Sequence, residues 1–253
     1  MANRSVPDFL IDTTERLSSA EAKSQILAVL DRKIREFGYD RYYLAHARRY
    51  TGGQAPGIAT ESTFNPDFLA EVVRERMHEA DLLTDNCWVS DRPMLWSSSQ
   101  RHLKDGSLGP AYKRTIRFTM DHRYFAGVTF ATQHQTDAQS EQFWSLSLLQ
   151  PAGFSAAEHD ANFPQVWQDL SFLLNAIVAR MDGSQFIREH FKLDAIDREC
   201  LIRVMNGLHV QQIADELMLA DRTAAYHLAK MRRKLNARNN AQAVALALLM
   251  DLV

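Results

Sequence analysis

The sequence predicts an α/β sensor domain, an α-β-α sandwich, followed by a small all-α domain of four helices. Three observations lead to this prediction. The chain has 253 residues, whereas single domains usually have roughly 100–200. Helical and strand patterns alternate before residue 183, and almost only helical patterns follow residue 190. We expect domains at 1–177 and 191–253, joined by a linker at 178–190 that contains the polar stretch Met181–Gln185.

Helices of the N-terminal part are indicated by apolar residues that recur every three or four positions. One helix is expected to end at Gly38, and a longer one to run from about Ala156 to Ala179. Shorter helices are expected near Phe68–Ala80 and Pro110–Asp121. The apolar positions of the first and the longest helix are Ile26, Leu27, Leu30, Ile34 and Phe37, then Phe163, Val166, Trp167, Leu170, Leu173, Leu174 and Ile177.

β-rich runs lie between these helices. Arg41–Tyr50 alternates like a strand, while Ala126–His134 and Gln142–Gln150 are separated by a polar connector typical of a hairpin. Such an irregular alternation of helices and strands favours an α/β or α+β sandwich, large enough to bury a core and enclose a ligand.

The C-terminal part reads as four helices. Asp194 or Asp197 would cap the first helix, which ends at Gly207. The other three are expected at Val210–Leu217, after a cap at Asp221, and at Asn240–Asp251. The first helix would turn four side chains inward: Cys200, Leu201, Val204 and Met205.

The third of these helices has two different faces. An apolar stripe repeats every three or four residues and consists of Ala224, Leu228, Met231 and Leu235. The opposite face carries Arg222, Ala225, Tyr226, Ala229 and Arg233. A short helix, a tight turn and a basic helix are typical of a helix-turn-helix, whose last helix enters the major groove of DNA.

The charge distribution supports this interpretation. The formal net charge is −2, but residues 184–253 hold ten Lys/Arg and eight Asp/Glu, and the remainder holds 19 and 23. Arg222–Arg238 contains six cations and no acidic residue. Such a cluster neutralises phosphates, although a solvated basic helix face gives the same pattern.

The C-terminal residues resemble the DNA-binding domain of LuxR-type transcription regulators. The matching residues are Asp197-Arg198-Glu199, Leu201, Gly207, Ile213-Ala214, Leu217, Thr223, His227-Leu228, Lys234-Leu235, Arg238-Asn239 and Ala243-Val244. The resemblance implies double-stranded DNA as a partner, with a two-fold symmetric operator. On this basis we expect DNA contacts from Arg222, Thr223, Tyr226, Lys230, Arg233, Lys234 and Arg238.

The fourth helix is unusually apolar for so small a domain. The resemblance implies that it dimerises, through residues such as Val244 and Leu248. Packing within the domain explains the same apolar pattern, so both interpretations stay open.

The N-terminal domain resembles the acyl-homoserine-lactone sensors of this group more than a phosphoacceptor receiver. Residues at the spacing of that family are Phe68, Val72, Asp81, Leu82 and Trp96. Asp81 and Trp96 keep the family's residue types, whereas Val72 and Leu82 replace its Tyr and Pro. Gly127-Val128-Thr129 and Phe143–Leu149 resemble the family's final hairpin, with Gln142 near a usual glycine.

The chemistry of an acyl-homoserine lactone fits these residue types. A carboxylate such as Asp81 accepts from the ligand's amide N–H, and the indole of Trp96 donates to the lactone carbonyl. Thr129 and Ser145 would donate to the acyl oxygen, and Phe68 and Val72 would line the site. A cap and core packing are the structural alternatives for Asp81 and Trp96.

These features predict a homodimeric, lactone-responsive regulator in quorum sensing, with no cofactor besides the ligand. The alternative is an orphan regulator that binds DNA without lactone or senses a different small molecule. Neither Cys87 nor Cys200 belongs to a CxxC pair, and we expect no metal site, membrane span or secretory signal. A cytoplasmic protein is therefore expected. The sequence contains no motif of an enzyme, so we expect no enzymatic activity. A protein that only sequesters a related regulator is a further alternative, but the basic helix argues against it as the sole role.

Overall fold

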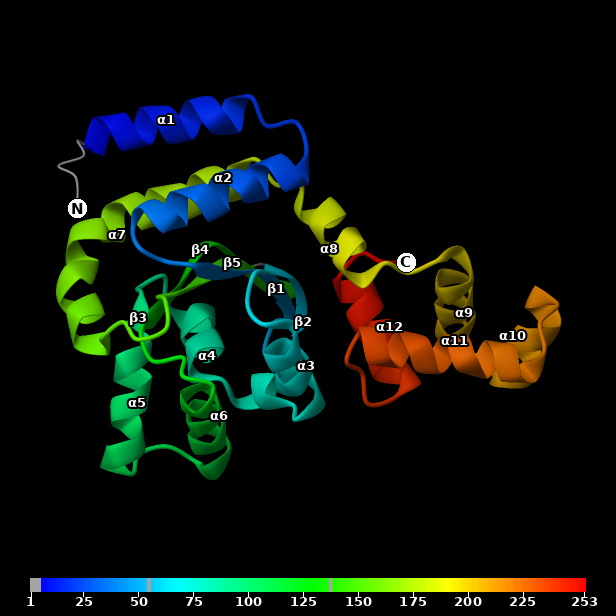
Figure 1. Cartoon of the computed structure of the whole chain (residues 1–253). Helices are drawn as coiled ribbons and strands as arrows, with labels where there is room; N and C mark the ends of the chain where they lie inside the picture. Colours follow the sequence, from blue (N-terminus) through cyan, green and yellow to red (C-terminus); the bar gives the residue numbers. More distant parts are fainter. Residues whose placement is uncertain (1–5, 54–55, 137) are drawn as a thin grey trace. The chain divides into compact units, whose positions relative to one another are not determined.

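The computed structural model describes residues 6–53, 56–136 and 138–253 (Figure 1). The helices of the N-terminal part are α1 (Val6–Ser18), α2 (Lys23–Glu36), α3 (Pro66–Arg74), the 3₁₀ helix η1 (Met77–Ala80), α4 (Leu82–Val89), α5 (Trp96–Asp105), α6 (Pro110–Asp121) and α7 (Ala156–Ala179). The strands are β1 (Arg41–Tyr50), β2 (Gly57–Ser62), β3 (Met94–Leu95), β4 (Gly127–Thr136) and β5 (Ser140–Leu149). The remaining helices are α8 (Gly183–Phe191), α9 (Ala195–Met205), α10 (Val210–Leu217), α11 (Asp221–Lys234) and α12 (Asn240–Leu249).

The strands form one sheet in the order β2-β1-β5-β4-β3. Consecutive strands β4 and β5 are neighbours, as the predicted hairpin requires, because so short a connection joins only antiparallel strands. At the edge, β3 runs antiparallel to β4, with Met94 opposite Thr129 and Leu95 opposite Val128. This pairing fixes where α5 begins, one residue after β3.

Helices cover both faces of the sheet (Figure 1). On one face lie α1, α2 and α7, and the ring of Phe130 on β4 meets the ring of Trp167 on α7 at 5.1 Å between centroids. On the other face lie α3, α4, α5 and α6. The predicted α-β-α sandwich is therefore confirmed, and side chains that alternate along each strand enter two different cores.

Helix α1 was not predicted from the sequence. It is held by the ring of Phe9, whose centroid lies 5.1 Å from that of Phe37, and by an ion pair of Asp12 with Lys33 of α2. Lys33 is fully buried, and a buried ammonium is stable only when paired. Because this pair links residues far apart in the chain, local periodicity gives no sign of it.

The four predicted C-terminal helices are present as α9 to α12. Asp194 is the cap of α9, and Asp197 completes a capping box with it. The prediction that Asp221 caps α11 is wrong, since Ala220 holds that position and Asp221 is the first helical residue. Met205 does not point inward as expected, because its place in the last turn of α9 leaves it exposed.

Most of the predicted linker at 178–190 is helical. Helix α8 begins after the cap Asp182, whose carboxylate accepts from the backbone N–H of Gln185 at 3.0 Å. Its apolar residues Phe186, Ile187 and Phe191 are buried, which explains why the segment is ordered. Packing divides the chain into two compact units, of which one contains His46–Thr60, Thr136–Gln142 and Asp182–Val253.

Gly127, the first residue of β4, tests how closely α5 is packed on the sheet. A Cβ atom there would lie 2.6 Å from the carbonyl oxygen of Leu148 and 2.8 Å from a ring carbon of Trp96. We expect Gly127→Ala to lower the free energy of unfolding by about 1–3 kcal/mol through overpacking, as measured by urea unfolding followed by tryptophan fluorescence. The control is Gly109→Ser, since a Cβ at Gly109 meets nothing within 4 Å and Ser is favoured at a helix N-cap. Equal losses in both variants would contradict the prediction.

Candidate functional site

An aromatic cluster lies between the sheet and the helices α3 to α6. Its buried members are Phe64, Phe68, Trp96 and Leu149, and Tyr43, Leu69, Val72, Leu83, Phe118 and Tyr124 pack against them. The ring centroid of Phe68 lies 4.6 Å from that of Tyr124 and 5.3 Å from that of Phe118. Phe64 and Tyr124 lie in loops, and the other eight residues come from β1, β5, α3, α4, α5 and α6. Apolar and aromatic side chains with a few polar groups are the usual lining of small-molecule sites.

A chain of hydrogen bonds runs from this cluster into the sheet. Because Met94 pairs with Thr129, Trp96 begins α5 beside the same strand. The indole Nε1–H of Trp96 donates to Oγ1 of Thr129 at 3.0 Å, and Thr129 Oγ1 lies 2.8 Å from Oγ of Ser147 on β5. An indole has one N–H to donate, so Thr129 accepts from the only side-chain donor of Trp96.

Asp81 lies at the turn between η1 and α4 and caps α4. Its Oδ1 accepts from the backbone N–H of Leu83 at 3.1 Å, and its Oδ2 from the hydroxyl of Thr84 at 2.7 Å. Burial raises the pKa of Asp81 above its ordinary value, although both hydrogen bonds oppose the rise. Burial likewise raises the pKa of the nearby Cys87 thiol to about 12.

The structure brings four of the six predicted ligand residues together. Phe68, Val72 and Trp96 belong to the aromatic cluster, and Thr129 is bonded to Trp96. Ser145 is buried on β5, two residues before Ser147. Asp81 is not a member of the cluster; it caps α4, whose residue Leu83 packs against the cluster.

Sequence reasoning missed several residues of this site. They are Phe64, Phe118, Tyr124, Ser147 and His122, whose ring centroid lies 4.4 Å from that of Phe118. Ser147 could have been found from the alternation of β5, since Ser145 and Ser147 share one face of the strand. Phe118 and His122 are four residues apart at the end of α6, a helical spacing that could have been found, whereas Phe64 and Tyr124 lie in loops and follow no such period.

Helix α11 presents a polar outer face in the helix-turn-helix. Its apolar stripe of Ala224, Leu228, Met231 and Leu235 is buried, as predicted. The turn before it is tight, with Met218 in the left-handed region at φ 52° and a backbone bond from Leu219 N–H to the carbonyl of Ala214. The hydrogen-bonded turn and the buried stripe together determine which side chains face outward.

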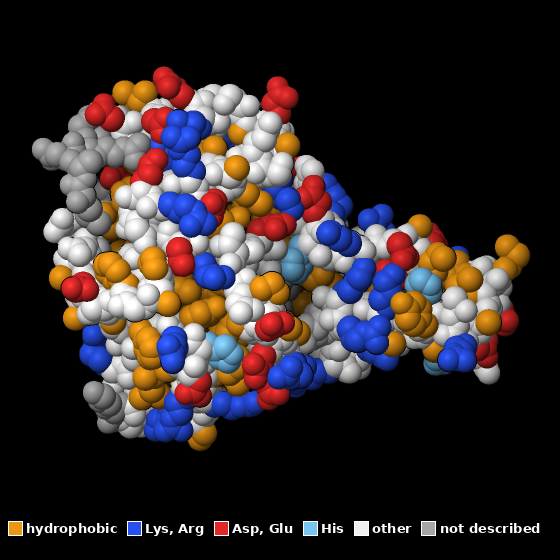
Figure 2. Space-filling model, in the orientation of Figure 1, with side chains coloured by type: hydrophobic (Ala, Val, Ile, Leu, Met, Phe, Trp, Pro, Cys, Tyr) orange, Lys and Arg blue, Asp and Glu red, His pale blue; other side chains and the backbone are white. Residues whose placement is uncertain are grey.

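Three of the predicted DNA contacts on α11 are exposed: Arg222, Tyr226 and Arg233. Arg238, just beyond α11, is also exposed, and Thr223 is half-buried. Lys and Arg side chains gather over the helix-turn-helix on the face drawn in Figure 2. An exposed row of cations beside an aromatic side chain is suited to the backbone and base edges of DNA.

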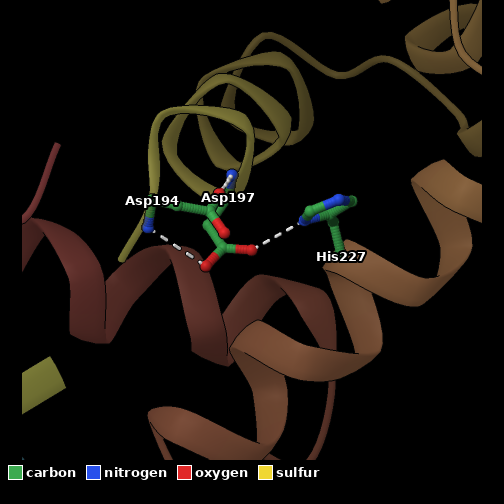
Figure 3. A group of neighbouring side chains, drawn as sticks. All are labelled: Asp194, Asp197 and His227. Atoms are coloured by element: carbon green, nitrogen blue, oxygen red, sulfur yellow. Dashed lines mark hydrogen bonds and ion pairs between the residues drawn. The ribbon is translucent and has the colours of Figure 1, made fainter. Parts of the chain in front are cut away.

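A polar network joins α9 to α11 (Figure 3). Nδ1 of His227 lies 2.8 Å from Oδ1 of Asp197. Nζ of Lys230 lies 2.6 Å from Oδ2 of Asp194 and 2.8 Å from Oδ2 of Asp197. Among the described residues, Asp194, Asp197 and His227 are the one group whose spacing could suit a metal ion. The ammonium of Lys230 already supplies a cation to both carboxylates, so we interpret the group as an internal ion network.

Two predicted dimerisation residues lie on one side of α12. Leu248 is 44% exposed, and Val244, one turn earlier, is half-buried. Ala243, Leu246 and Ala247 are buried. Packing within the chain therefore accounts for part of the apolar surface of α12 and leaves Leu248 exposed.

Within the described ranges, no helix is both long and apolar enough to cross a bilayer.

Two family models match the chain. Residues 22–139 match the autoinducer binding domain, and residues 195–247 match the model for bacterial regulatory proteins of the luxR family. No curated protein sequence matched.

Solved structures show the same fold. Escherichia coli SdiA, at 14% identity, has a TM-score of 0.53 and is matched over 98% of this chain and 99% of that chain. CepR2 from Burkholderia cenocepacia, described as an N-acylhomoserine-lactone-dependent LuxR family factor, is also 14% identical with a TM-score of 0.53, over 69% of this chain and 93% of that chain.

The residues matched by the first family model lie in the sandwich, and those matched by the second form the helix-turn-helix. The chain therefore belongs to the LuxR-type quorum-sensing regulators, in which an autoinducer-binding domain precedes a DNA-binding domain.

Proposed function

We propose that this regulator is a homodimer that binds an acyl-homoserine lactone and, through α11, a two-fold symmetric DNA site. The observation that carries the ligand proposal is the aromatic cluster, which gathers Phe68, Val72 and Trp96 next to the hydroxyls of Thr129 and Ser147. Apolar walls with few polar groups suit an acyl chain with a polar head. DNA binding in the cytoplasm, without enzymatic activity, completes the proposal.

In this proposal Asp81 accepts the amide N–H of the ligand. Each carboxylate oxygen has two lone pairs, so the cap on α4 leaves acceptor positions on Asp81. Thr129 and Ser145 are the proposed donors to the acyl oxygen. The indole of Trp96 reaches a lactone carbonyl only by leaving Thr129, because it has one N–H.

The need to break the bond between Trp96 and Thr129 supports a second candidate function. This candidate is an orphan regulator that binds DNA without lactone or senses a different ligand. Trp96 is already bonded to Thr129, and Val72 has no hydroxyl where the sensor family has a Tyr. One missing hydrogen bond weakens binding by roughly 0.5–1.5 kcal/mol.

One experiment separates the two candidates. The full chain is produced in cells that make no lactone, and its solubility and DNA binding are compared with and without added lactone. Lactone-dependent folding and DNA binding would support the first candidate. Full activity without lactone, with no small molecule in the organic extract by mass spectrometry, would support an orphan regulator.

The ionisation of Asp81 gives a pH test of the ligand proposal. Because its pKa is raised, the charged acceptor is lost at a higher pH than for an ordinary Asp. We expect the affinity for lactone to fall as the pH is lowered from about 8 to about 4, as measured by calorimetry. Asp81→Asn should bind more weakly at the upper pH and show little dependence on pH. A pH dependence that persists in Asp81→Asn would contradict the role of Asp81.

The exposed position of Leu248 gives a test of the dimer. We expect Leu248→Glu to weaken self-association about tenfold or more, because loss of an apolar anchor at an interface costs roughly 1–2 kcal/mol or more. Analytical ultracentrifugation measures the dissociation constant of the dimer, and titration of a palindromic duplex measures the affinity for DNA. Met205→Glu is the matched control, since Met205 is equally exposed but lies on α9. Similar effects of both changes would argue against a dimer through α12.

A further inference from the structure

Three polar side chains of α11 point toward α9 rather than outward. His227, Lys230 and Lys234 are spaced by three and four residues and share one side of the helix. Each contacts Asp197: His227 at 2.8 Å, Lys230 at 2.8 Å and Lys234 at 3.7 Å. Lys234 also donates to the backbone carbonyl of Lys192. Lys230 and Lys234 of the basic cluster therefore form ion pairs with a carboxylate of the same domain.

Asp197 is the centre of this arrangement. Its side chain is 0% exposed, and its Oδ2 also accepts from the backbone N–H of Asp194 at 3.2 Å. A carboxylate buried without partners would cost several kcal/mol, and here four donors surround it. Because they come from two helices, the carboxylate restricts how α11 can rotate against α9.

The charges of the network are stable. Burial alone would raise the pKa of Asp197, but hydrogen bonds from His227 and Lys230 outweigh it and hold the pKa below the ordinary value. The hydrogen bond from Lys230 also lowers the pKa of Asp194 to about 2. The same two carboxylates raise the pKa of Lys230. At neutral pH both carboxylates are ionised and Lys230 is charged.

We propose that Asp197 is a positioning residue for DNA recognition, and that Lys230 and Lys234 serve it as internal counter-ions instead of binding phosphate. By fixing the rotation of α11, Asp197 sets the direction of Arg222, Tyr226 and Arg233. This rests on the proposed function of α11 as the recognition helix. It reassigns two residues that the sequence predicts as DNA contacts.

The proposal separates two kinds of DNA affinity. Reading base edges requires α11 in one orientation, whereas non-specific binding depends mainly on cationic charge near phosphates. Loss of the Asp197 carboxylate should therefore reduce specific binding and leave non-specific binding unchanged or stronger, since two lysines lose a counter-ion.

The first test is the salt dependence of DNA binding. The full chain is measured on the duplex that it selects from a random library, and on a scrambled duplex of equal length. We expect Arg233→Met to reduce the slope of log K against log[salt] by about 0.9, the value for one phosphate contact, and Lys230→Met to leave the slope unchanged. Equal reductions in both variants would overturn the role of Lys230.

The second test changes Asp197 itself. We expect Asp197→Asn to lower affinity for the selected duplex at least tenfold with no loss on the scrambled duplex, and Asp197→Glu, which keeps the carboxylate, to restore part of the ratio. Partial unfolding would lower both affinities together, so circular dichroism and this ratio distinguish a positioning role from loss of fold. An unchanged ratio in Asp197→Asn would overturn the proposal.

A double-mutant cycle in unfolding experiments checks the network without DNA. Asp197→Asn and Lys230→Met should be non-additive, because each removes the same contact. Additive effects would overturn the network. This experiment distinguishes failure of the network from failure of the proposed function. Non-additive effects in a chain that selects no DNA would show that the network exists and that the DNA-binding proposal is wrong.

Discussion

The packing of the aromatic cluster and of α5 on the sheet depends on the hydrogen bond from Trp96 to Thr129. This bond joins the start of α5 to the start of β4, at a place where β3 contributes only two residues to the sheet. Around it gather the rings of Phe64 and Phe68. A ligand that bonded to the indole would have to replace this contact, and would therefore change the packing of α5 on the sheet.

Sequence patterns predicted the elements that have a long, regular apolar period. The stripe of α11, the long helix α7 and the final hairpin repeat with a regular period, and the period reports which face is buried. Helices α1, α4, α5 and α8 escaped notice. They are short or rely on distant partners, as α1 does on Lys33. The period of a helix shows which of its faces is buried, but it does not show which residue of another element packs there.

The candidate sites follow the same division. The resemblance to the sensor family pointed to Phe68, Asp81 and Trp96, but not to Ser147, which meets Thr129 only when β4 and β5 are paired. In the helix-turn-helix, a count of cations treated Lys230 and Arg233 alike. Their difference depends on the carboxylates of Asp194 and Asp197, which approach from α9. The residue type of Lys230 and Arg233 shows that both are charged, but only the packed structure shows that Lys230 points toward α9 and Arg233 toward solvent.

Both cysteines of the chain are buried as free thiols. Burial raises the pKa of each, Cys87 in the sensor and Cys200 in the helix-turn-helix. Oxidants and electrophiles attack the thiolate, which such surroundings suppress. Neither half of the regulator therefore offers a thiolate at its surface, and the exposed thioether of Met218 is a more accessible sulfur for an oxidant than either cysteine.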